Sequence, residues 1–255
     1  RDISNDAKRC SPNSSPGRSI GGINLKKTLV ICRGWYNLLF FPTSLSNTSN
    51  IGIARVTQSI DFYFAVSSPW TYLAGPRFEK LIKKYNLKVN WKPYDVPRVF
   101  ALTGTKPVPQ RPPQIQANRL NELRRWREYL DMPLNLQPKF FPADPTPAAH
   151  MLISAKQTGG EISKLANAYM RAYWVEEKNI TDTATLINIA DKLGWNGRAV
   201  FESSTGAAVL AEYEENSEEA VERNVFGVPT WIYENELFWG QDRLDFLARA
   251  VESQL

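Results

Sequence analysis

Cysteine and histidine are scarce in this sequence of 255 residues. The two cysteines, Cys10 and Cys32, are too few for a disulfide framework or a four-ligand zinc site. The single histidine, His150, has no motif around it, which excludes His-based metal clusters and argues against a Ser–His–Asp hydrolase. We therefore expect no metal site, and thiol chemistry in residues 57–255 would need a thiol from another molecule.

Long apolar runs are also missing. The longest one, residues 28–41, is shorter than the roughly 18 residues of a membrane-spanning helix and is interrupted by Arg33. No membrane partner is therefore expected. A hydrophobic share of 43% and a charged share of 22% are ordinary for a globular protein, and the length suits one large domain or a domain with an insertion.

The net charge of +5 is concentrated near the start of the chain. Residues 1–59 hold eight Lys or Arg and two Asp, which leaves the remainder close to neutral, so no nucleic-acid partner is expected. Residues 1–56 are rich in Asn, Ser, Gly and Pro and show no periodicity. We interpret them as a leader, either a disordered or non-native extension or a basic transit peptide. The first reading predicts a cytoplasmic protein and the second a mitochondrial one.

The periodicity becomes clear after this leader. Alternation over residues 59–66 predicts a strand, and Ser68 with Pro69 has the pattern of a helix start. A helix reaching Tyr85 and a strand over 88–94 follow, and a right-handed crossover would make the two strands parallel. The prolines of 97–113 predict a loop.

Helical patterns fill most of 115–224, with a break near Gly206, and the strands 230–233 and 237–239 predict a hairpin before a last helix capped by Asp242. This order predicts an α/β fold. We expect a thioredoxin-like sheet (β-α-β … β-β-α) with a large all-helical insertion. Residues 57–100 and 225–255 would form the thioredoxin-like domain, and 101–224 the insertion.

Three motifs occur in one order along this body: DFYFAVSSPWTYL at 61–73, NVFGVPT at 224–230 and FWGQDRL at 238–244. Together they resemble the 2-hydroxychromene-2-carboxylate isomerase family. That family is related to the kappa-class glutathione transferases and to DsbA-type thioredoxin-fold oxidoreductases. The resemblance covers about 57–255 and supports the predicted fold.

The resemblance implies that glutathione is the cofactor. Ser68 matches the catalytic serine of the family, whose hydroxyl donates to the glutathione sulfur. Val228 and a cis Pro229 would hold the peptide backbone, and the segment Trp239, Gly240, Gln241 and Asp242 would bind the γ-glutamyl end. The residues alone leave another interpretation open, in which Ser68 and Asp242 are only helix caps.

The resemblance also places a substrate cleft, with Arg98, Thr105, Lys106, Asp144 and Thr146 as candidates. The family usually has Asn at 105, so an amide contact there is in doubt. The expected activity is glutathione-dependent isomerisation of 2-hydroxychromene-2-carboxylate-like intermediates of aromatic degradation. The alternatives are a kappa-like transferase and a non-catalytic glutathione- or peptide-binding module. The expected partner is a small aromatic electrophile, and a homodimer is left open.

Overall fold

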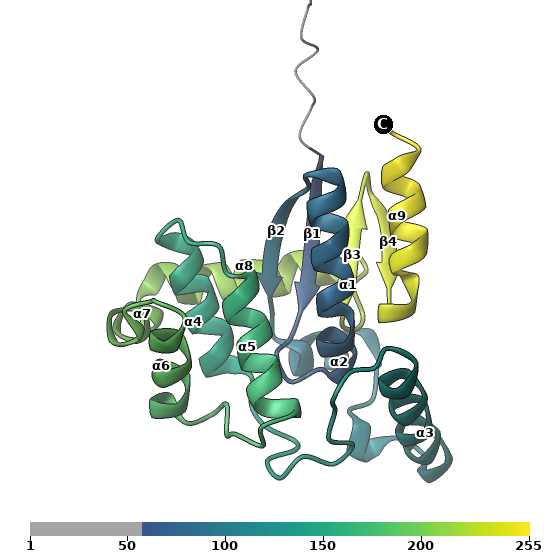
Figure 1. Cartoon of the computed structure of the whole chain (residues 1–255), viewed down its shortest axis with the longest axis horizontal. Coiled ribbons are helices and arrows are strands. Elements are labelled where there is room, and N and C mark those ends of the chain that lie inside the picture. The colour runs from purple at the N-terminus through teal and green to yellow at the C-terminus, as the bar shows by residue number, and fades with distance from the viewer. Residues whose placement is uncertain (1–57) are drawn as a thin grey trace, which may run out of the picture. The chain divides into compact units, whose positions relative to one another are not determined.

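The structure is a computed structural model, and it describes residues 58–255. The predicted leader and both cysteines lie outside the described residues. Figure 1 shows the described part as a sheet with helices on both faces. Its elements are β1 Ser59–Phe64, α1 Pro69–Tyr85, β2 Lys88–Pro93, α2 Val96–Thr103, the 3-10 turn η1 Val108–Gln110, α3 Pro113–Tyr129, α4 Thr146–Gln157, α5 Ser163–Trp174, α6 Thr183–Lys192, α7 Gly197–Ser204, α8 Ala207–Glu222, β3 Thr230–Tyr233, β4 Glu236–Trp239, the 3-10 turn η2 Gln241–Arg243 and α9 Leu244–Glu252.

The four strands form one mixed sheet in the order β2-β1-β3-β4. β1 and β2 are parallel, whereas β3 is antiparallel to both β1 and β4. The hairpin between β3 and β4 turns through Glu234 and Asn235, which both have positive φ as a type I′ turn requires. The predicted thioredoxin-like fold is therefore confirmed, including the parallel first pair and the hairpin.

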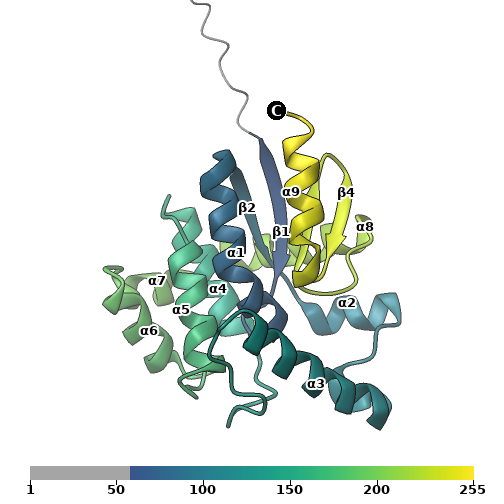
Figure 2. The same ribbon diagram turned by 45° about the vertical axis from the view of Figure 1, so that its right-hand side comes forward.

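The alternation in β1 directs side chains to two different cores. Phe62 and Phe64 are buried on the face covered by α1 and α9 (Figure 2), where Phe62 stacks on Trp231 at 5.2 Å and meets Phe78 of α1 at 4.9 Å. Tyr63 belongs to a second buried cluster on the α8 face. Because β1 packs against buried aromatic side chains on both faces, its position is well defined. The turn that follows β1 and leads into α1 is positioned by the same packing.

The segment between β2 and β3 is helical, as predicted, and α4 and α8 both contact β2. The break near Gly206 is confirmed, because α7 ends at Ser204 and α8 begins at Ala207.

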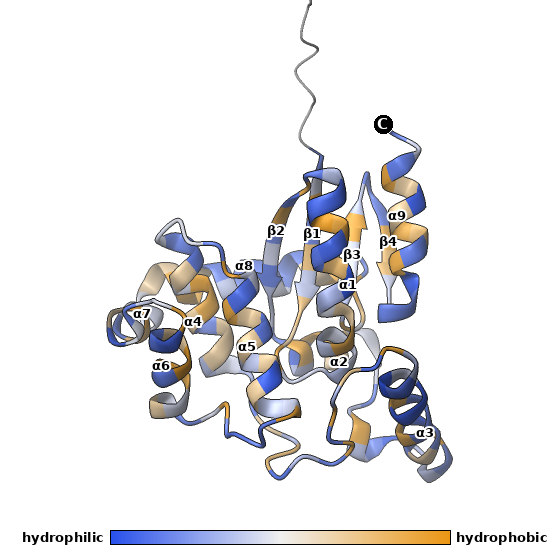
Figure 3. Ribbon diagram, in the orientation of Figure 1, coloured by the Kyte–Doolittle hydropathy of each residue, from blue (hydrophilic) through white to orange (hydrophobic). Residues whose placement is uncertain are grey.

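Helix α3 differs from the other helices of this segment: Figure 3 shows α3 as mostly hydrophilic, and Leu123 is its one buried residue. The division of the body at residues 100 and 225 stays a prediction. Among residues 58–255, no helix combines the length and apolarity needed to span a bilayer.

The loop predicted over 97–113 is wrong in its first half. Helix α2 runs from Val96 to Thr103, and Asp95 caps it by accepting a hydrogen bond from the Arg98 N–H at 3.0 Å. Pro97 lies in the first turn, where a missing N–H breaks no helical bond. The prolines therefore mark the start of a helix here as well as the loop that follows it.

The predicted cap at Asp242 is also wrong. Asp242 lies inside η2, its carboxylate pairs with Arg243 at 2.8 Å, and no side chain caps α9. The chain enters α9 through a 3-10 turn, whose geometry supplies the transition without a capping side chain. The Asp242 carboxylate is thus exposed and not engaged with the helix backbone.

A polar network joins β1 and β2 to α8. Glu219 accepts hydrogen bonds from Tyr63 Oη at 2.8 Å and Lys92 Nζ at 2.5 Å, and Arg223 bridges Glu219 and Asp61. Burial opposes the charge of Glu219, but the hydrogen bonds from Lys92 and Tyr63 outweigh it and hold the pKa of this carboxyl below its usual value of 4.5. The charged form therefore stabilises the folded protein.

We expect Glu219→Gln to lower the free energy of unfolding by about 1 kcal/mol at neutral pH, since the network is partly exposed to solvent. The pKa of Glu219 is lowered, so its contribution is present above pH 4.5 and is lost as the pH falls through the folded pKa. Urea unfolding at pH 7 and below pH 4 measures this difference. Glu214→Gln is the control, because among residues 58–255 Glu214 forms a salt bridge with Arg98 alone, at the surface. Equal losses in both variants, or a loss independent of pH, would contradict the assignment.

Candidate functional site

The turn between β1 and α1 presents a serine hydroxyl at the start of a helix. Ser68 has extended backbone angles (φ −90°, ψ 122°), and its Oγ accepts a hydrogen bond from the Thr71 N–H at 3.2 Å. The predicted cap is therefore confirmed. A hydroxyl also carries one donor hydrogen, so the capping bond leaves the Ser68 hydrogen available to a ligand. Capping and ligand binding are compatible in this geometry.

The N-terminus of α1 favours a negative charge beside Ser68. The helix is 17 residues long. Because its first turn contains no acidic residue, no side chain there neutralises the positive end of the helix dipole. Pro69 has no N–H, and the Trp70 N–H has no backbone partner among residues 58–255. Both residues line the same cavity as Ser68. An anion placed here would meet a hydroxyl donor and a peptide N–H.

The Val228–Pro229 peptide bond is cis, as predicted from the family resemblance. It lies directly before β3, and Val228 lines the cavity that Ser68 lines. Within residues 58–255, neither the N–H nor the C=O of Val228 makes a hydrogen bond. Such a backbone segment can pair with an extended peptide as an added strand would.

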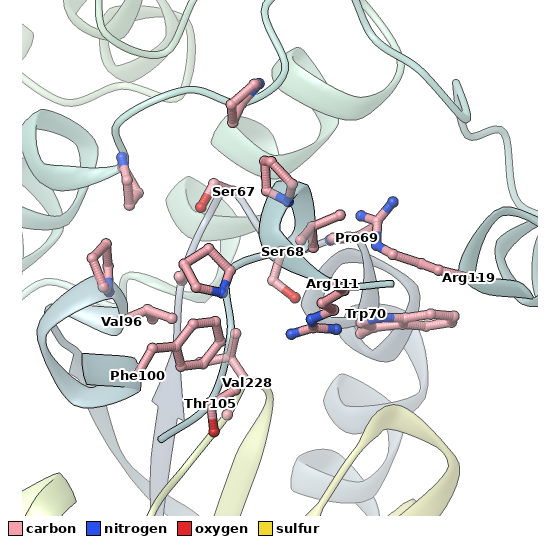
Figure 4. A pocket seen from close by; sticks show the side chains of 18 of the residues that line it. Ser67, Ser68, Pro69, Trp70, Val96, Phe100, Thr105, Arg111, Arg119 and Val228 are labelled. Carbon is pink, nitrogen blue, oxygen red and sulfur yellow. The ribbon is translucent and has the colours of Figure 1, made fainter. Parts of the chain in front are cut away.

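These elements surround a cavity of about 550 Å³, within the usual range for small-molecule sites. Figure 4 shows Ser67, Ser68 and Val228 around one part of it. Most of the remaining wall consists of proline and aromatic side chains, among them Trp70, Phe100 and Phe141. No Asp or Glu of the described chain lines it. The Phe141–Pro142 peptide bond in this wall is also cis, and no sequence motif predicted it.

The predicted γ-glutamyl segment is divided by the structure. Trp239 lines the cavity and packs against Phe226 in a tilted arrangement, with the ring centres 4.7 Å apart, while Gly240, Gln241 and Asp242 are not lining residues. The Gln241 side chain is buried and bonds to Arg77 of α1, which also donates to the Gln241 carbonyl at 2.8 Å. Arg77 thus ties this segment to the helix that carries Ser68.

The other predicted cleft residues lie in different places. Thr105 lines the cavity, and its hydroxyl donates to the Phe226 carbonyl at 3.4 Å. Arg98 pairs with Glu214 and Glu218 of α8 at the surface. The remaining cleft candidates are not lining residues, although their chain neighbours are; these are Lys106, Asp144 and Thr146. Pro229, predicted to hold the peptide, is not a lining residue either, but it directly follows Val228, which is.

The structure adds one charged residue that sequence reasoning missed. Arg119 projects from α3 into the cavity, with its guanidinium 5.2 Å from the centre of the Phe141 ring. Arg111, from the proline-rich segment that precedes this helix, lines the same cavity. Burial, together with the like charge of Arg111, lowers the pKa of Arg119 to about 10. No local signal marks Arg119, because an arginine on a polar helix is usually solvated.

His150 and metal ligation play no visible part in this cavity. The His150 ring packs edge-on against Tyr213 at 4.8 Å, and burial lowers the pKa of the imidazole. Across residues 58–255, no group of three or more His, Cys, Asp and Glu side chains is arranged to hold a metal ion. The polar side chains that line the cavity are therefore the hydroxyls of Ser67, Ser68 and Thr105, two indoles and two guanidinium groups.

The sequence and the fold are similar to those of several known proteins. The family model for the DsbA-like thioredoxin domain matches residues 59–252. The 2-hydroxychromene-2-carboxylate isomerase of Pseudomonas putida is 32% identical over 195 residues, which cover 75% of this chain and 93% of that protein. The glutathione S-transferase kappa 1 of Caenorhabditis elegans is 24% identical over 206 residues, 76% of this chain and 90% of that protein. A solved 2-hydroxychromene-2-carboxylate isomerase superposes with a TM-score of 0.63 at 30% identity, covering 77% of this chain and 95% of the other.

Proposed function

The chain belongs to the 2-hydroxychromene-2-carboxylate isomerase family of enzymes, and on that premise we propose that it is a glutathione-dependent isomerase. Its substrate would be a 2-hydroxychromene-2-carboxylate-like intermediate of aromatic degradation. The observation that carries the proposal is the pairing of two groups on one cavity. A serine hydroxyl at a helix N-terminus and an unpaired Val228 backbone both face it.

The residues present fit glutathione. The unpaired N–H and C=O of Val228 suit a peptide, and the cavity of about 550 Å³ can hold a tripeptide beside a small aromatic molecule. No cysteine lies among residues 58–255, and in this proposal bound glutathione supplies the thiol. Trp239 contacts Phe226, which lies two residues before Val228. Its indole would therefore cover a peptide bound along the Val228 backbone.

Glutathione, when bound, supplies a thiolate nucleophile that adds to the electrophilic carbon of the substrate and is later expelled. Ser68 would donate its hydroxyl hydrogen to the sulfur, and the N-terminus of α1 would favour the charged thiolate. The Val228 backbone would hold the peptide in register with Ser68. The apolar wall would exclude water and orient the aromatic ring, which places the reacting groups together.

Thermal unfolding with and without reduced glutathione tests the cofactor assignment. A ligand at 100 times its Kd adds about 2.7 kcal/mol, which raises the Tm by roughly 5–10 °C for a domain of this size. The matched control is the tripeptide γ-glutamyl-alanyl-glycine, which lacks the thiol. We expect it to stabilise the protein and to support no turnover.

The reaction itself is followed by absorbance of the ring-opened product at a fixed glutathione concentration. Isomerisation predicts product formation with no net loss of glutathione thiol. Accumulation of a stable glutathione adduct would instead favour the transferase alternative. Stabilisation by glutathione without turnover of any aromatic electrophile would favour the binding module. Absence of stabilisation by millimolar glutathione would overturn the proposal.

A further inference from the structure

Arg111 and Arg119 are the charged side chains of the cavity. Both line it, and among residues 58–255 neither forms a salt bridge with an acidic side chain. The side chain of Arg111 makes one hydrogen bond, from Nε to the Lys106 carbonyl at 2.8 Å, which leaves its terminal nitrogens available. Two cations without an acid give this apolar cavity a positive potential.

Without a bound anion, the positive charges of Arg111 and Arg119 repel each other in a largely apolar cavity. Burial and the charge of Arg111 together lower the pKa of Arg119, yet the group remains protonated at neutral pH. Arg119 keeps its charge over the ring of Phe141, whose quadrupole attracts the guanidinium. A bound anion would relieve the repulsion between the two arginines.

We propose that Arg111 and Arg119 form the carboxylate-binding site for the aromatic substrate, and that they make the enzyme select anionic electrophiles over neutral ones. This assignment rests on the proposed function, because it presupposes an electrophile in the cavity. A guanidinium matches a carboxylate through two parallel hydrogen bonds. The wall of prolines and aromatic rings suits the rest of such a ligand.

The carboxylate could belong to the electrophile or to the glycine end of glutathione. The position of Arg119 favours the electrophile. Figure 4 shows Arg119 and Val228 on opposite sides of Ser68, and Arg119 lies over Phe141 in the helical segment. The unpaired Val228 backbone and Trp239 mark the peptide side of the cavity. An electrophile attacked by the thiolate held beside Ser68 would therefore extend toward Arg119, on the side away from the peptide.

The test compares Arg119→Met and Arg111→Met with Arg124→Met. Arg124 lies on the same helix α3, pairs with Glu128 at the surface at 3.9 Å and does not line the cavity. The electrophiles are an arylidene pyruvate and its methyl ester, each assayed at saturating glutathione. We expect the ratio of kcat/KM for acid to ester to fall roughly 10- to 150-fold in Arg119→Met, as for the loss of a charged hydrogen bond. Arg119→Lys should recover part of the ratio, and Arg124→Met should leave it unchanged.

A binding measurement keeps the test independent of turnover. Cinnamate should stabilise the wild-type protein against heat more than cinnamamide does, and Arg119→Met should abolish the difference. Equal stabilisation by the two ligands in the wild type would overturn the inference, even if no electrophile is turned over. A rise in the Kd of glutathione in Arg119→Met, with the acid-to-ester ratio unchanged, would overturn it too and assign the arginines to the glycine carboxylate. If the ratio falls while that Kd stays constant, the inference is supported.

Discussion

Replacing Ser68 with alanine is expected to lower kcat roughly 10- to 150-fold, the effect of removing one hydrogen bond to a charged group. The pKa of bound glutathione should rise, because the thiolate loses a donor while the neutral thiol loses less. The N-terminus of α1 remains, so activity should recover in part at high pH. The Kd of glutathione should change less than kcat, since the Val228 backbone still holds the peptide. A pH–rate profile measures both effects.

Ser68→Ala also removes the cap of α1, because the Thr71 N–H loses its acceptor. That loss costs about 0.5–2 kcal/mol of stability, and a second variant separates it from catalysis. Asp caps helices as well as Ser does, but an ionised Asp cannot donate and repels a thiolate. Ser68→Asp should therefore keep the wild-type Tm and be at least as inactive as Ser68→Ala. Ser67→Ala should be mild. An unchanged pH–rate profile in Ser68→Ala would reduce Ser68 to a helix cap.

Gly227→Ala is expected to destabilise the protein by about 1–3 kcal/mol, the usual effect of overpacking. A Cβ at this position would lie 2.5 Å from Nε1 and 3.2 Å from Cε2 of Trp239. The indole is a rigid ring and has to move as a whole, which disturbs its packing against Phe226. The Tm should fall roughly 2–12 °C, at 2–4 °C per kcal/mol for a domain of this size. Glutathione should bind more weakly, because Gly227 precedes Val228 and Trp239 lines the cavity.

A double variant identifies the cause of this loss. If the clash with Trp239 is responsible, Gly227→Ala combined with Trp239→Ala should be no less stable than Trp239→Ala alone. Neighbouring substitutions that share one contact are expected to be strongly non-additive. Thermal unfolding of the four proteins gives the coupling energy. Additive losses would show that the substitution acts in another way, such as by displacing the 227 carbonyl, which accepts hydrogen bonds from Tyr94 and Thr230.

The sequence predicted the parts of the fold that depend on periodicity and turn chemistry. Alternation in β1, the Ser68–Pro69 start of α1 and the break at Gly206 are local signals, and the structure confirms them. Helix α2 escaped prediction because proline is typical of both loops and first helical turns. Asp242 has the composition of a helix cap, but the preceding Gly240 has φ 102°, and the chain enters α9 through η2 instead.

The site was less accessible to sequence reasoning, because its composition depends on contacts between distant segments. The cis bond at Pro229 opposes the local preference for trans and was expected only through the family motif. Arg119 lies more than 50 residues after Ser68, on a helix whose composition indicates exposure to solvent. Its role in the cavity depends on the packing of α3 against α1 and on Phe141, which no pattern within α3 encodes.

The proline-rich wall of the cavity has a thermodynamic consequence. Its prolines have no N–H to offer a ligand, and their fixed φ leaves the backbone little freedom to lose on binding; they are Pro69, Pro97, Pro107, Pro109, Pro142 and Pro145. Such a surface recognises shape and apolar area, and a pocket of this kind distinguishes ligands that differ by one methylene only about 10- to 200-fold. We therefore expect the cavity to accept aromatic ligands with different ring substituents. The heat capacity of binding should accordingly be negative and scale with the size of the aromatic ring.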